Sequence, residues 1–77
     1  MIKEGNLVFN DANGKTRSIP VTKLYGFATR PYLDSHYIVY TNEDGEQENI
    51  LVSQETSTMV KSDVLRYINS RDYYKNH

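Results

Sequence analysis

The stretch that decides the fold is Tyr37 to Val52, which reads Tyr-Ile-Val-Tyr-Thr-Asn-Glu-Asp-Gly-Glu-Gln-Glu-Asn-Ile-Leu-Val. Two apolar runs flank a polar turn, and this pattern predicts a β-hairpin. Asn42 at the start and Gly45 at the end are typical of a type I turn closed by a glycine bulge, because glycine takes a positive φ without steric cost. The Tyr, Ile and Val residues of the flanks suit a pleated, half-buried surface.

The turn predicts the pairing of the two strands. With a three-residue loop, Glu43 to Gly45, Ile38 opposes Ile50, and alternate side chains fall on opposite faces. One predicted face gathers His36, Ile38, Tyr40, Ile50 and Val52, and the other gathers Tyr37, Val39 and Leu51. Since the base of the hairpin is apolar on both faces, we expect a central hairpin covered by a helix on one face. Another part of the sheet or a partner would cover the second face.

A similar hairpin precedes this one. Leu7 to Val21 aligns without gaps on Ile38 to Val52 at an offset of 31 residues, with turns ending at Gly14 and Gly45. Two interpretations stay open: an internal repeat, or two hairpins that resemble each other because they share a turn. In the repeat, the basic arm (Lys15, Arg17) and the acidic arm (Glu46, Glu48) are able to meet, within one chain or between two.

The remaining segments before the helix predict one more strand and its connections. Met1 to Asn6 reads as a frayed lead-in. Pro20 cannot donate to a β-ladder, so its strand should lie at an edge or bend away. Leu24 to Thr29 predicts a linking strand with a weak point at Gly26, the kind of position where a bulge occurs. Arg30 to Ser35 reads as a loop.

The C-terminal segment predicts an amphipathic helix. Val60, Val64, Tyr67 and Ile68 follow the spacing of one helical face. Thr56 or Ser57 is expected to cap the start, with Ser62 as an alternative cap, and the helix should end near Tyr74. Lys61 falls inside the apolar arc, and a long stem that carries its ammonium group to water explains it.

Together these elements predict a single α+β domain over residues 1–77. A small antiparallel sheet of about five strands, two similar β-hairpins plus a linking strand over about 7–53, should be packed by one helix over about 56–74. At 77 residues the core is small, so self-association as a homodimer is a reasonable expectation.

Composition narrows the function classes. The chain has no cysteine, which excludes a disulfide framework and a thiolate metal site. Its net charge of −1 supplies no long-range attraction to nucleic acid or to anionic lipid. No apolar run approaches the length of a membrane span or of a signal-peptide core, so we expect a cytoplasmic protein without membrane contact. Neither a cofactor, a metal nor a small-molecule ligand is indicated.

The clustered candidates for catalysis are Asp34, Ser35 and His36. They have the chemistry of a nucleophilic triad, but neighbours on an extended segment point to opposite faces and cannot form the relay. The sequence therefore predicts no catalytic site and a protein that is not an enzyme.

The tyrosines carry more information, since there are seven of them and no tryptophan. Tyr37 and Tyr40 are three positions apart on one strand and so lie on opposite faces. The outward ring of this pair, together with Arg30 and Tyr32, would form an amphipathic contact patch of the kind found at protein interfaces.

We therefore expect a small non-catalytic binding or regulatory module that contacts another protein or its own copy, of the type of bacterial or phage accessory proteins. The alternative is a nucleic-acid-binding domain. In that domain, Tyr37 or Tyr40 would stack bases on a sheet face beside the basic residues Lys15, Arg17 and Arg30.

Overall fold

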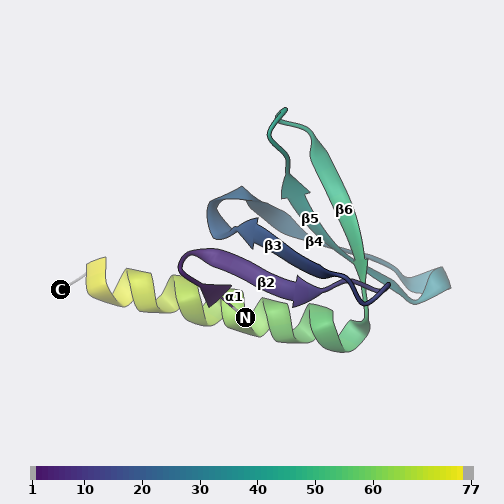
Figure 1. Cartoon of the computed structure of the whole chain (residues 1–77). Coiled ribbons are helices and arrows are strands. Elements are labelled where there is room, and N and C mark those ends of the chain that lie inside the picture. The colour runs from purple at the N-terminus through teal and green to yellow at the C-terminus, as the bar shows by residue number, and fades with distance from the viewer. Residues whose placement is uncertain (1, 76–77) are drawn as a thin grey trace.

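Two antiparallel sheets of three strands each and one C-terminal helix make up the fold (Figure 1). The computed structural model describes residues 2–75 and the side chains of residues 2–70. Sheet A has the order β1-β2-β3 and sheet B the order β4-β5-β6. The strands are β1 (Ile2–Lys3), β2 (Asn6–Asn10), β3 (Thr16–Pro20), β4 (Leu24–Arg30), β5 (Ser35–Thr41) and β6 (Gln47–Val52), followed by the helix α1 (Gln54–Lys75).

The predicted α+β class and the terminal helix are confirmed, whereas the single sheet of about five strands is wrong. Two local features explain the difference. Ile2–Lys3, expected to be part of a frayed lead-in, forms β1 and pairs with β2 through a two-residue turn. In that turn Glu4 and Gly5 both have positive φ, 55° and 80°, as a type I′ hairpin requires. A 3₁₀ turn at Val21–Lys23 then separates β3 from β4, which are not paired.

The two predicted hairpins have the same register and the same turn. Leu7 pairs with Ile19 in β2–β3, and Ile38 pairs with Ile50 in β5–β6, which are equivalent positions at the offset of 31. In both turns the glycine has a positive φ, 81° at Gly14 and 82° at Gly45. The side chains of Asp11 and Asn42 each accept two backbone N–H bonds from within their own turn. The two hairpins therefore resemble each other in backbone geometry as well as in amino-acid sequence.

The strand irregularities lie where the sequence predicts them. Pro20 ends β3, which is an edge strand of sheet A. In β4 the register shifts between Leu24 and Gly26, so Tyr25 occupies a bulge next to Gly26, the predicted weak point.

The helix starts earlier than predicted. Ser53, rather than Thr56, Ser57 or Ser62, is the N-cap: its Oγ accepts the backbone N–H of Thr56 at 3.1 Å, and its carbonyl accepts that of Ser57 at 2.9 Å. Lys61 reaches across to sheet B, where its Nζ lies 5.4 Å from the centre of the Phe27 ring. An ammonium group over an aromatic face is attracted by the ring quadrupole, which explains a lysine in the apolar arc.

The core forms where the inner faces of both sheets meet α1. Figure 1 shows α1 running along one side of the strands, with the tip of the β5–β6 hairpin projecting away from it. The buried apolar cluster takes Leu7, Phe9 and Ile19 from sheet A, Ile38, Ile50 and Val52 from sheet B, and Val60 and Val64 from the helix. Of the two predicted faces of the β5–β6 hairpin, the one that carries Ile38, Ile50 and Val52 enters the core.

Candidate functional site

Of Tyr37 and Tyr40, it is Tyr37 that lies on the outer face of sheet B, which is the face opposite the core. Tyr37 pairs with Ala28 and Leu51, none of which belongs to the core cluster. Tyr40 shares the inner face with Ile38 and packs against the core. Tyr37 is therefore the outward ring. Leu51 beside it remains 44% exposed, so part of this apolar face is open.

One end of sheet B carries the two most exposed large apolar side chains among the described residues. The chain turns between β4 and β5 through the 3₁₀ turn Pro31–Leu33, and there Tyr32 is fully exposed and Leu33 is 67% exposed. At the adjacent strand ends, the Arg30 guanidinium carbon lies 5.8 Å from the centre of the Tyr37 ring. We call Arg30, Tyr32, Leu33 and Tyr37 the β4–β5 corner.

Local backbone chemistry holds this corner in shape. Pro31 occupies the first turn position, where its fixed φ suits the 3₁₀ conformation. Asp34 closes the turn with a left-handed φ of 49°, and its N–H donates to the Pro31 carbonyl at 3.2 Å. The Ser35 hydroxyl donates to the Leu33 carbonyl at 3.3 Å. Tyr32 and Leu33 are thus displayed by an ordered turn.

A cleft of about 560 Å³ lies between β3 and the tip of the β5–β6 hairpin, and its lining includes Ile19, Tyr40 and Ile50. Arg17 and Lys23 line one side, and Glu43 and Asp44 line the other.

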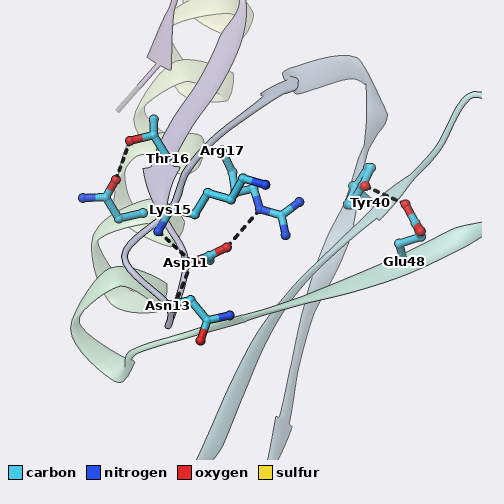
Figure 2. A network of polar contacts seen from close by, with 8 residues as sticks. Asp11, Asn13, Lys15, Thr16, Arg17, Tyr40 and Glu48 are labelled. Carbon is cyan, nitrogen blue, oxygen red and sulfur yellow. Dashed lines mark hydrogen bonds and ion pairs between the residues drawn. The ribbon is translucent and has the colours of Figure 1, made fainter.

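Two side chains that line this cleft, Arg17 and Tyr40, are engaged by carboxylates of the same chain (Figure 2). The Nε of Arg17 donates to Asp11 at 3.0 Å, and the Tyr40 hydroxyl donates to Glu48 at 2.6 Å. The backbone N–H of Lys15, the Arg17 guanidinium and the backbone N–H of Asn13 hold the pKa of Asp11 below its ordinary value of 3.8. The bond to Glu48 favours the neutral phenol, so it raises the pKa of Tyr40 above 10.0.

The predicted binding residues lie in three separate parts of the structure. Arg30, Tyr32 and Tyr37 lie together at the β4–β5 corner. Arg17 and Tyr40 line the cleft, and Lys15 follows the β2–β3 turn. Arg17 pairs with Asp11 of its own hairpin and Glu48 with Tyr40, so neither of these residues joins the basic arm to the acidic arm.

Two features of these sites were not predicted from the sequence. Leu33 adds an exposed aliphatic side chain beside Tyr32; an apolar residue within a Pro-containing loop was the available signal. Asp11 is a buried carboxylate, only 5% exposed in its side chain. Its place four residues before Lys15, equivalent to that of Asn42, marked it as the residue that caps a turn.

Asp34, Ser35 and His36 do not form a relay. The Ser35 hydroxyl is directed to the Leu33 carbonyl, and the His36 imidazole lies on the inner side of β5. Its Nε2 is 3.5 Å from an Asp34 carboxylate oxygen, yet among the described residues this buried atom has no hydrogen-bond partner. The three side chains therefore lack the serine–histidine contact on which nucleophilic catalysis depends.

Other kinds of site were sought in the part of the chain that the structure describes. Within it, no cluster of three or more histidine or carboxylate side chains is arranged to hold a metal ion. None of its helices combines the length and apolarity needed to cross a membrane. Comparison of the chain with models of protein families, with curated proteins and with solved structures gives no match in any of the three.

Proposed function

We propose that this chain is a small protein-binding module that contacts its partner through the β4–β5 corner. The observation that carries the proposal is the display of Tyr32 and Leu33 on an ordered turn, far more exposed than apolar side chains in a folded core. Tyrosine and arginine are the residues enriched at the energetic centres of protein interfaces, and Arg30 and Tyr37 supply both beside this turn.

The same geometry argues against a nucleic-acid surface. That alternative needs exposed rings and basic side chains on one face, so that bases stack while phosphates are neutralised. Arg17 is engaged by Asp11 on the inner side of β3, and Arg30 is the one basic residue of the β4–β5 corner, where the exposed Tyr32 and the outward Tyr37 lie. The net charge of −1 also gives no general attraction to phosphates.

The proposal is tested by placing a photoreactive phenylalanine analogue at Tyr32 and, as the control, at Glu43 on the exposed hairpin tip. In cells of the source organism, we expect Tyr32 to crosslink to a defined protein that Glu43 does not capture. The substitution Leu33→Ser should reduce the adduct without changing the melting temperature, because this side chain packs against little of the fold.

Two results would contradict the proposal. Equal crosslinking from both positions would mean that the corner has no special affinity. An adduct that disappears on nuclease treatment, together with salt-sensitive binding of a single-stranded oligonucleotide, would point to the nucleic-acid alternative.

A further inference from the structure

The four edge strands of the two sheets differ in how well they are protected against pairing with another strand. Free edges carry unpaired N–H and C=O groups, and proteins block them with short strands, prolines, charges or covering segments. β1 has two residues, and β3 contains Arg17 and ends at Pro20. On β6 the Leu51 carbonyl accepts the Ala12 N–H at 2.8 Å, and Glu48 adds a charge.

β4 lacks most of these protections. It is seven residues long, reads Leu-Tyr-Gly-Phe-Ala-Thr-Arg, and carries no charge before Arg30. Its bulge lies near one end, at Tyr25, which is 65% exposed. In the described part of the chain β5 is its sole paired neighbour, so the opposite edge pairs with no strand.

The register shows which backbone groups of β4 face this edge. Within an antiparallel ladder, successive residues direct their N–H and C=O groups alternately to the two sides. The Asn42–Glu46 backbone bond and the β5–β6 register direct Tyr40 and Ile38 toward β6, so Val39 and Tyr37 bond toward β4. Their partners Gly26 and Ala28 face β5, which leaves the groups of Phe27 and Thr29 directed outward.

From this we infer that β4 pairs antiparallel with β4 of a second copy of the chain, giving a symmetric dimer with one continuous sheet of six strands. Phe27 is the midpoint of β4, so a twofold axis beside it lets each Phe27 bond to its counterpart, and Thr29 then lies opposite the bulged Tyr25 of the partner, where the regular ladder ends. In that register Arg30 faces the partner's Leu24, and no like charges are opposed.

A second copy fits this edge better than an unrelated strand for three reasons. Self-pairing satisfies the same outward groups on both molecules and closes the assembly at two copies. It also places the exposed Tyr25 near the partner's Thr29. The chain is short, so its single core gains from added burial. The inference does not rest on the proposed function, because β4 pairing uses the sheet edge and leaves Tyr32 free.

Sedimentation over a range of concentrations tests the pairing through two proline variants. Thr29→Pro removes an outward N–H that the dimer uses, and Ser18→Pro removes the corresponding outward N–H on the β3 edge. We expect the unmodified chain to dimerise, Thr29→Pro to weaken the dimer by about tenfold or more, and Ser18→Pro to leave it unchanged. Far-UV spectra establish whether both variants fold.

A disulfide test covers the case in which Thr29→Pro does not fold. The chain has no cysteine, and the proposed register places Gly26 opposite the partner's Ala28 in a non-hydrogen-bonded pair, where the Cα atoms lie about 4.5 Å apart. A mixture of Gly26→Cys and Ala28→Cys chains should therefore form the mixed disulfide dimer in preference to either homodimer. Gly26→Cys mixed with Ser18→Cys should not crosslink above background.

Three results would overturn the inference. One is a monomer at every concentration that remains soluble. The second is a dimer that Thr29→Pro does not weaken and that forms no mixed disulfide between the Gly26→Cys and Ala28→Cys chains. The third is a dimer that Tyr32→Ala dissolves, which would place the contact at the β4–β5 corner instead. In all three cases the crosslinking result at Tyr32 judges the proposed function separately.

Discussion

Asp11 and Asn42 occupy equivalent positions in the two hairpins and differ in charge. Each side chain accepts two backbone N–H bonds in its turn, while Asp11 also accepts a bond from the Arg17 guanidinium. The neutral amide of Asn42 shows that the turn itself needs an acceptor and no charge. What the carboxylate adds is the ion pair and a dependence on pH.

The first prediction follows from the lowered pKa of Asp11. A group whose pKa is depressed on folding stabilises the fold above its unfolded value, here 3.8, and that contribution is lost as the pH falls through the folded value. The variant Asp11→Asn should keep the turn, melt at a slightly lower temperature than the parent near pH 7, and show a smaller loss of stability below about pH 4.

Thermal unfolding of both proteins across the acidic range provides the measurement. The two melting curves should approach each other at low pH, where the parent's carboxyl group is protonated. A constant gap between them at all pH values would show that Asp11 acts through shape alone.

At the scale of elements, the hairpin glycines meet a conformational requirement that Gly26 does not. Gly45 has a φ of 82°, whereas Gly26 lies outside the positive range, and a Cβ at Gly26 would meet nothing within 4 Å. Since a Cβ is strained at positive φ, Gly45→Ala should lower the free energy of unfolding by about 1 to 2 kcal/mol. Gly26→Ala should leave it unchanged or raise it by up to about 1 kcal/mol.

Denaturant unfolding of the two variants measures this difference directly. An equal effect of both substitutions on the midpoint would mean that the hairpin turn tolerates a side chain, contrary to its observed backbone.

The start of the helix gives a second prediction at this scale. Ser53→Ala removes the cap that binds the Thr56 N–H, and should cost about 1 kcal/mol. Ser62→Ala, at an exposed position inside α1, should be neutral or stabilise by about 0.5 kcal/mol, because alanine has the higher helix propensity. Chemical denaturation distinguishes the two variants, because their unfolding midpoints should shift in opposite directions or by unequal amounts. The reverse order would place the helix start at Ser62.

At the scale of the whole molecule, the two faces of sheet B should respond differently to truncation. Ile38 is fully buried where both sheets meet α1, while Leu51 lies partly exposed on the outer face. Ile38→Ala should therefore cost about 2 to 5 kcal/mol, a large share of the stability of a chain this size, whereas Leu51→Ala should cost about 1 kcal/mol or less.

Equilibrium unfolding in urea provides the comparison. A large cost at Leu51 in a strictly monomeric sample would show that the outer face contributes to an interior, and would remove the basis for treating it as an open surface.

Much of the local structure follows from the sequence alone, because its causes are local. The turns from Asp11 to Gly14 and from Asn42 to Gly45 place an acceptor side chain before a glycine that takes positive φ. That chemistry sets the register, and with it the side chains that share a face. The sequence also marks Pro20 as an edge and Gly26 as a weak point, for equally local reasons. Among the residues of the β4–β5 corner, the sequence indicated Arg30, Tyr32 and Tyr37 as candidates, but it did not decide whether Tyr37 or Tyr40 faces outward.

Tertiary structure decided how the strands are grouped, which tyrosine faces outward and where the open edge lies. The backbone groups at a strand's edge are alike whatever the side chains, so local pattern does not say which strands pair. The grouping of the strands depends on the packing of Leu7, Ile38 and Val60 into one core, in which two three-stranded sheets lie against α1. The same packing turned Tyr40 inward and left Tyr37, the β4–β5 corner and the free edge of β4 outside.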